Sequence, residues 1–121
     1  MGLFDFLKKK LPESGKQPED YYNVTITDKF VLVEHPKWGS SQIDWKEIVE
    51  IKIITTDEGP FLPDVWIVLI GNGSKCQIPQ GAKEYDVIYD LISKYEGFNF
   101  ENVIAAASCT ENKEFLVWTR N

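Results

Sequence analysis

The chain has 121 residues, 43% of them hydrophobic, with 4 Trp, 5 Tyr and 7 Phe, and a formal net charge of −6. This length and apolar content predict one domain with its own core and exclude a disordered chain. The acidic balance argues against nucleic acid as the main ligand, because affinity for nucleic acid comes largely from neutralising phosphates. Two cysteines and one histidine cannot complete a closed zinc site by themselves, and no cofactor is expected.

Residues 1–11 differ from the rest of the chain in charge. They carry three lysines, Lys8, Lys9 and Lys10, against one aspartate, a net charge of +2, whereas the remaining residues have a net charge of −8. On a helix, the apolar side chains of this segment fall within an arc of about 160°. They are Leu3, Phe4, Phe6, Leu7 and Leu11. The sequence therefore predicts a short amphipathic N-terminal helix, ended by the proline that follows it.

Residues 12–20 are polar and rich in helix breakers, which predicts a linker between this arm and a single globular domain over residues 21–121. The arm has two interpretations. It packs on an apolar face of its own domain or of a second copy, or it lies on an anionic membrane, where each lysine contributes about 1 kcal/mol. The lysines follow the apolar residues, unlike in a secretory leader. We therefore expect a cytoplasmic protein, peripheral to the inner face of the membrane under the second interpretation.

The first part of the domain alternates apolar and polar residues, as half-buried strands do. Strands are expected over six segments: 22–27, 30–34, 41–45, 48–55, 65–70 and 75–78. The strand over 65–70 is apolar on both faces, which is typical of a central strand. Asn72 and Gly73 then predict a type I′ hairpin turn.

From residue 82 to residue 96, apolar residues recur at helical spacing, and Gly97 stands where a helix C-cap belongs. Asn99 is expected to cap a second, shorter helix. The expected inner face of that helix consists of Val103, Ile104 and Ala107.

A final strand is expected over residues 114–119. These elements predict an α+β domain built on a strongly bent antiparallel sheet or split barrel of about seven strands. Two C-terminal helices, the final strand and the short N-terminal amphipathic helix complete the expected fold.

Residues 41–51, Ser-Gln-Ile-Asp-Trp-Lys-Glu-Ile-Val-Glu-Ile, resemble the strand–turn–strand of bacterial pleckstrin-homology-like domains. This resemblance implies a strongly bent sheet or split barrel with a helix plugging one end, although this chain adds a second helix and a final strand. Residues 55–61, 64–65, 78–82 and 112–118 look like a group of small bacterial proteins of unknown role. That second resemblance implies a bacterial cytoplasmic origin and no particular activity.

Trp38 is a candidate contact residue, because it lies between Lys37 and Gly39 in a predicted loop. A tryptophan in such a loop is either an exposed interface anchor or a lid over the open end of the sheet.

Asp57, Glu58 and Asp64 place three carboxylates around a Gly-Pro loop. They lack the spacing of a calcium-binding loop, and solvated turn-forming acids are the simpler interpretation. An enzyme that used this loop would need a pocket joining it to other polar side chains, namely Gln80, Thr110 or Asn112.

The sequence thus favours a non-catalytic cytoplasmic module that binds another protein, either a basic partner or a second copy of itself. A toxin-neutralising immunity protein is one form of such a module, and it requires an exposed apolar or acidic patch. The first alternative is a peripheral membrane adaptor that docks through the N-terminal arm, with salt-sensitive lipid binding. The second alternative is an enzyme that uses the 57–64 loop.

Overall fold

The structure, a computed structural model, describes residues 21–57 and 64–120. The expected N-terminal helix, the linker over residues 12–20 and Glu58 lie outside the described residues. The strands and helices follow one another as β1 Asn23–Ile26, β2 Phe30–His35, β3 Gly39–Asp44, β4 Ile48–Thr55, β5 Val65–Gly71, β6 Lys75–Pro79, α2 Tyr85–Ile92, α3 Phe100–Ala107 and β7 Lys113–Thr119. Within the described part of the chain, no helix is long and apolar enough to span a membrane.

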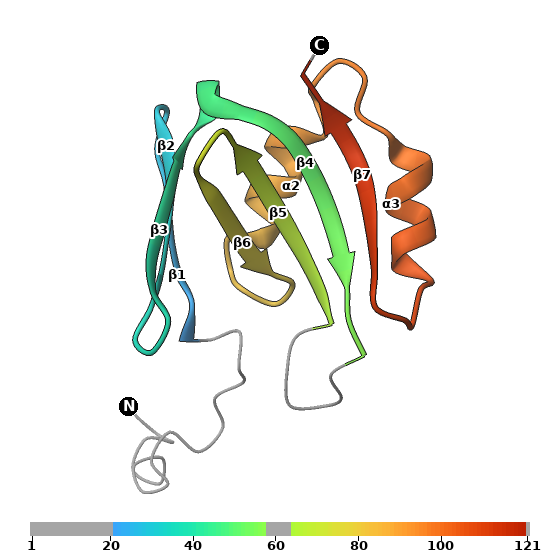
Figure 1. The fold of residues 1–121 in the computed structure, drawn as a ribbon, viewed down its shortest axis with the longest axis horizontal. Coiled ribbons are helices and arrows are strands. Elements are labelled where there is room, and N and C mark those ends of the chain that lie inside the picture. Colours follow the sequence, from blue (N-terminus) through green and yellow to red (C-terminus); the bar gives the residue numbers. More distant parts are fainter. Residues whose placement is uncertain (1–20, 58–63, 121) are drawn as a thin grey trace, which may run out of the picture.

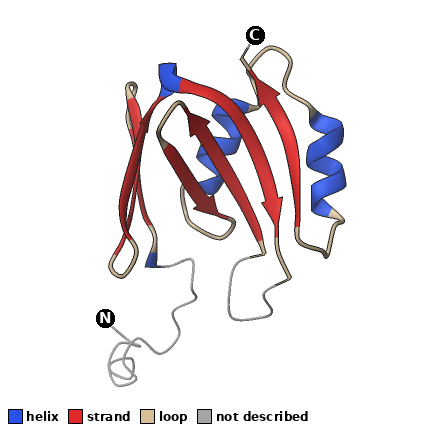
Figure 2. Ribbon diagram, viewed as in Figure 1, coloured by secondary structure: helices blue, strands red, loops and turns tan. Residues whose placement is uncertain are grey.

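The seven strands form two open antiparallel sheets, which Figures 1 and 2 show in the same orientation. One sheet has the order β1-β2-β3 and the other has the order β6-β5-β4-β7. The chain passes from the first sheet to the second through a 3₁₀ turn at Trp45–Glu47. The predicted α+β class, the antiparallel strands, the two helices near the C-terminus and the final strand are confirmed, and β5 is an inner strand as expected.

One hydrophobic core joins the two sheets to α2, which lies behind the four-stranded sheet in Figure 1. The strands supply their inward-facing alternate residues, as the period of two requires. Ile43 of β3, Ile67 of β5 and Ile88 of α2 are among the fully buried members of this core.

The hairpin turns are held in different ways. Thr27 Oγ1 accepts the backbone N–H groups of Lys29 and Phe30 at 3.1 and 3.0 Å, and these bonds hold the tight turn between β1 and β2. The predicted type I′ turn after β5 is wrong. That turn needs a positive φ at both central residues, and only Gly73 (φ 90°) adopts one, whereas Asn72 does not.

Helix α2 is shorter than predicted, since it ends at Ile92 and not at residue 96. After Ile92 the chain tightens into turns, in which Tyr95 N–H bonds to Ile92 O and Phe98 N–H bonds to Tyr95 O. Such i→i−3 bonds are common where an α-helix unwinds at its end. Gly97, with φ 88°, supplies the left-handed residue of this connection, five positions beyond the helix.

The predicted inner face of α3 is wrong in two of its three residues. Ala106 is 2% exposed and faces the core, and Val103 is half-buried beside it. Ile104 is 70% exposed and Ala107 is also exposed. The helix therefore turns small side chains towards the sheet, which allows its backbone to approach β7 closely, and leaves its largest aliphatic side chain outside.

Candidate functional site

Helix α3 is fixed to the edge of the four-stranded sheet by its first turn. The Asn99 side chain accepts the N–H of Asn102 at 3.0 Å, as predicted for an N-cap. The Asn102 side-chain amide donates to Leu116 O at 2.7 Å, and Asn99 N–H donates to Val117 O at 2.8 Å. These bonds occupy backbone carbonyls of β7 and set the position of α3 relative to the sheet.

A groove of about 250 Å³ runs between α2 and α3, and we call it the interhelical groove. One wall comes from α2, through Tyr85, Asp86 and Tyr89, and the other comes from α3, through Val103, Ala106 and Ala107. The floor comes from the strands and the segment after β6, through Ile53, Val65 and Gln80. Among the described residues that line it, Asp86 alone is formally charged, so they offer apolar surface with one carboxylate.

Two large apolar side chains of α3 are exposed on the side of the helix next to Ala107, although neither lines the groove itself. Phe100 is 52% exposed and Ile104 is 70% exposed. At 100° per residue, they lie about 20° and 60° from Ala107 around the helix axis, on the side away from Val103. Ala105 lies about 160° from Ala107, outside the groove. The groove and these two side chains together form what we call the interhelical face.

On α2, Val87 and Leu91 are also exposed, and they are four residues apart on one side of the helix. They lie away from Tyr89, which lines the interhelical groove. They therefore form a separate apolar strip on the other flank of α2.

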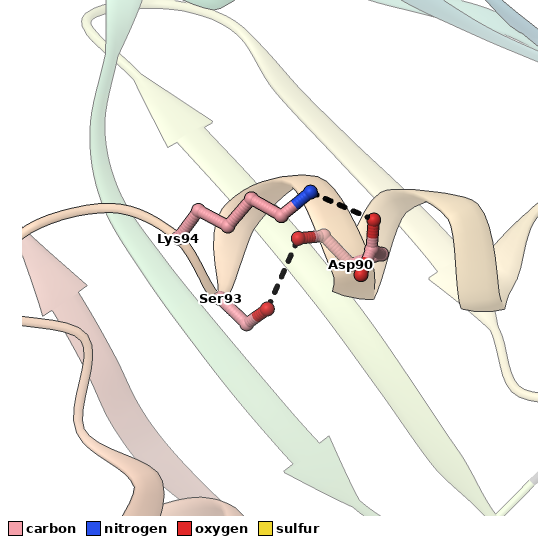
Figure 3. Close-up of polar contacts among 3 residues, drawn as sticks. All are labelled: Asp90, Ser93 and Lys94. Atoms are coloured by element: carbon pink, nitrogen blue, oxygen red, sulfur yellow. Dashed lines mark hydrogen bonds and ion pairs between the residues drawn. The ribbon is translucent and has the colours of Figure 1, made fainter.

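The interhelical face lies in an acidic part of the protein. Residues 83–111, which we call the helical layer, carry six acidic and two basic side chains, a net charge of −4. The acidic residues are Glu84, Asp86, Asp90, Glu96, Glu101 and Glu111. Between described residues, the layer has one ion pair, in which Lys94 Nζ lies 3.1 Å from Asp90 Oδ2 (Figure 3). Both partners are exposed, so this pair contributes about 0.5 kcal/mol or less, and most of the acidic charge remains available to a partner.

Tyr85 stands where the groove meets the core. Burial raises the pKa of its hydroxyl to about 12, and the neighbouring Asp86 carboxylate adds to this effect. The hydroxyl therefore stays neutral throughout the physiological range, and Tyr85 presents the groove with an uncharged ring.

Trp38 lies in the turn between β2 and β3, and its side chain is 68% exposed. His35 Nδ1 holds this turn by accepting the N–H groups of Lys37 and Trp38 at 3.0 and 3.2 Å. Lys37 Nζ lies 5.0 Å from the centre of the Trp38 ring. A hollow of about 440 Å³ adjoins the turn and reaches Lys75 on β6. The local charge here is positive, and contact of Trp38 with a partner stays a prediction.

The structure does not join the predicted carboxylates to the interhelical groove. Asp57 and Asp64 are both exposed, at the two described ends of their loop. Thr56 N–H donates to Asp64 O at 2.8 Å, and Asn112 Oδ1 accepts Asp57 N–H at 3.1 Å. Gln80 lines the interhelical groove, whereas neither aspartate lines it. Over residues 21–57 and 64–120, no three His, Cys, Asp or Glu side chains gather as a metal site would require.

The sequence reasoning missed the interhelical face. The signal was present in part, because Phe100 and Ile104 are spaced four apart and would share one side of a helix. The groove itself depends on the distance between α2 and α3, which are separated in sequence by a turn whose path the periodicity does not fix.

Comparison with protein-family models, with curated proteins and with solved structures finds no match for this chain. A proposal for the function therefore has to be argued from the surface chemistry described above.

Proposed function

We propose that this domain is a non-catalytic protein-interaction module, and that its interhelical face binds a basic amphipathic segment of a partner protein. The observation that carries this proposal is the combination of an apolar groove, two exposed apolar side chains and a net charge of −4 in the same helical layer. A cytoplasmic location forms part of the proposal.

The apolar part of the face suits contact with another chain. Phe100 and Ile104 expose large apolar side chains beside a groove whose floor is Ile53 and Val65. Grouped apolar side chains with a polar surround are typical of docking surfaces, and a helix commonly docks in a groove by side chains three and four residues apart. Burying one such side chain contributes about 1.5–3 kcal/mol.

The acidic part of the face determines the kind of partner. Asp86 in the groove wall and the net charge of −4 of the helical layer favour a basic segment and raise its association rate, since complementary charge steers diffusional encounters. Asp86 is placed to pair with a lysine or arginine of a segment that enters the groove. An immunity protein that neutralises a basic toxin is one form of such a module.

The proposal includes a finer description of the fold. The two open sheets meet at the Trp45–Glu47 corner, and Ile43 and Ile67 share one core with Ile88 of α2. This arrangement supports a split barrel with α2 at one end, and it leaves α3 outside the barrel as a second wall for a groove.

A pair of matched variants tests the proposal. Ala107→Arg places a bulky cation in the groove wall, whereas Ala105→Arg makes the same change on the opposite side of α3; both positions are exposed. Immobilised wild-type protein and Ala105→Arg are expected to capture the same basic protein from the native lysate, and Ala107→Arg is expected to lose it. Equal capture by all three proteins, or a captured protein that is acidic, would contradict the proposal.

A further inference from the structure

The chain contains a segment whose chemistry matches the proposed partner of the interhelical face. The N-terminal arm, residues 3–11, carries Lys8, Lys9 and Lys10 against Asp5, a net charge of +2, whereas the helical layer has a net charge of −4. On a helix, Leu3, Phe4, Phe6 and Leu7 would share one side. An amphipathic basic segment of this kind is the class of ligand that the groove and its acidic surround accept.

The arm is able to reach the groove of its own chain. The described chain begins at Tyr21, and the ring of the next residue, Tyr22, lies 5.6 Å from the ring of Trp66 in an edge-on contact. Val65, the residue before Trp66, lines the interhelical groove. Because consecutive side chains of a strand point to opposite faces of the sheet, the linker has to carry the arm from the Trp66 side of β5 to the Val65 side. A nine-residue linker spans up to about 30 Å when extended, more than twice the radius of gyration of about 13 Å expected for a domain of 100 residues. Residues 12–20 therefore allow docking within one chain.

The groove has room for the arm's side chains and not for the whole helix. Its volume of about 250 Å³ accommodates one or two large apolar side chains between Tyr89 and Ala107. A short linker keeps the arm at an effective concentration in the millimolar range, so an arm whose dissociation constant for the groove is below about a millimolar fills the groove most of the time.

We infer that the N-terminal arm docks in the interhelical groove of its own chain and competes there with the basic partner. The competition rests on the proposed function, whereas the docking does not. A groove that holds the arm cannot bind the partner at the same time. If the arm occupies the groove in about nine-tenths of the molecules, it weakens partner binding about tenfold.

Amide chemical shifts of the ¹⁵N-labelled full-length protein test the docking. Phe6→Ser removes an apolar contact of the arm, and Lys16→Glu, a change in the linker, is the control. Phe6→Ser is expected to shift the amides of residues 85–89 and 103–107 and to leave the β2–β3 turn unchanged. Lys16→Glu is expected to leave both regions close to their wild-type shifts. The pattern is expected to be the same at low and high protein concentration.

Several results would overturn the inference. Shifts confined to residues before Tyr21 would mean that the arm does not contact the helical layer, and shifts at another face would place it elsewhere. A pattern that appears only at high concentration would assign the arm to a second copy. The proposed function fails separately: if the docking shifts are present but Ala107→Arg and Ala105→Arg capture the same proteins, the arm fills the groove and no partner competes for it. If the arm docks in the groove and the partner also binds there, the Phe6→Ser variant is expected to bind the partner about tenfold more tightly than the wild type does.

Discussion

Tyr85 connects the stability of the domain with the chemistry of the interhelical groove. It is only 9% exposed, and its hydroxyl makes no hydrogen bond to another described residue. Because the ionised form would be poorly solvated at this position, burial raises the pKa of Tyr85 to about 12, with a smaller contribution from Asp86. The same burial that keeps the ring neutral therefore makes folding dependent on pH in the alkaline range.

Replacing this tyrosine is expected to remove part of that dependence. Between about pH 10 and pH 12 the unfolded chain loses the Tyr85 proton while the folded chain keeps it, so the free energy of unfolding falls as pH rises. A difference of about two pKa units corresponds to about 2.7 kcal/mol at most. Tyr85→Phe is expected to be similar to the wild type at pH 8 and about 2 kcal/mol more stable at pH 11.5, as measured by urea unfolding.

The matched control for this experiment is Tyr89→Phe. Tyr89 lies four residues after Tyr85 in the same helix, and its side chain is half-buried. Tyr89→Phe is expected to keep most of the alkaline loss of stability that Tyr85 causes, because burial raises the pKa of Tyr85 more than the nearby Tyr89 does. If Tyr85→Phe and the wild type lost stability in parallel from pH 8 to pH 11.5, burial of the Tyr85 hydroxyl would not be the cause.

At the scale of elements, the orientation of α3 creates the interhelical face. Its capping bonds and the Asn102–Leu116 bond fix the start of the helix on β7, and Ala106 then faces the core. Ile104, two residues earlier, is consequently held in solvent. Most of this apolar side chain, which is 70% exposed, is therefore available for contact with a partner.

Two substitutions in α3 test this orientation. Ala106→Leu adds volume at a position that is 2% exposed and is expected to cost about 1–3 kcal/mol, because a packed site has no room for added methylene groups. Ile104→Ser changes a position that is 70% exposed and is expected to alter stability by about 0.5 kcal/mol or less. Urea unfolding of both variants measures the difference, and the opposite order would mean that Ile104 faces the core.

The elements show how much of the fold and the site can be predicted from the sequence. Alternation located the strands, and the Asn99 cap located the start of α3, because these signals are local. The inner face of α3 could not be predicted, since Ala105, Ala106 and Ala107 are three consecutive alanines. Their sequence does not indicate which side of the helix faces the core. Contacts with β7 decide which of them is buried, and these contacts join residues far apart in the chain.

The site was less predictable than the fold. The loop position of Trp38 could be predicted, because a tryptophan between a lysine and a glycine is a local signal. The structure places Trp38 in a turn, where it is exposed. The groove arises from the relative placement of α2, α3 and the sheet, which sequence periodicity does not determine. The acidic charge of residues 83–111 can be counted from the sequence. It indicates a binding surface only together with the exposure of Phe100 and Ile104, which the structure shows.

At the scale of the whole molecule, charge divides the surface between two exposed aromatic regions. The helical layer has a net charge of −4, whereas the turn that carries Trp38 has Lys37 beside the ring and Lys75 across the adjoining hollow. A basic partner is attracted to the first region and repelled by the second. At physiological ionic strength the field of exposed charges is largely screened beyond about 8 Å.

The most direct measurement is photo-crosslinking in the protein's native cells, with p-benzoylphenylalanine placed at one position of the full-length chain. Ile104 reports on the interhelical face, and Trp38 reports on the β2–β3 turn; both side chains are more than half exposed. We expect a discrete adduct with a basic protein from the Ile104 position and none from the Trp38 position. An adduct from Trp38 and none from Ile104 would contradict the account, because the partner would then bind at the positively charged β2–β3 turn and not at the interhelical face.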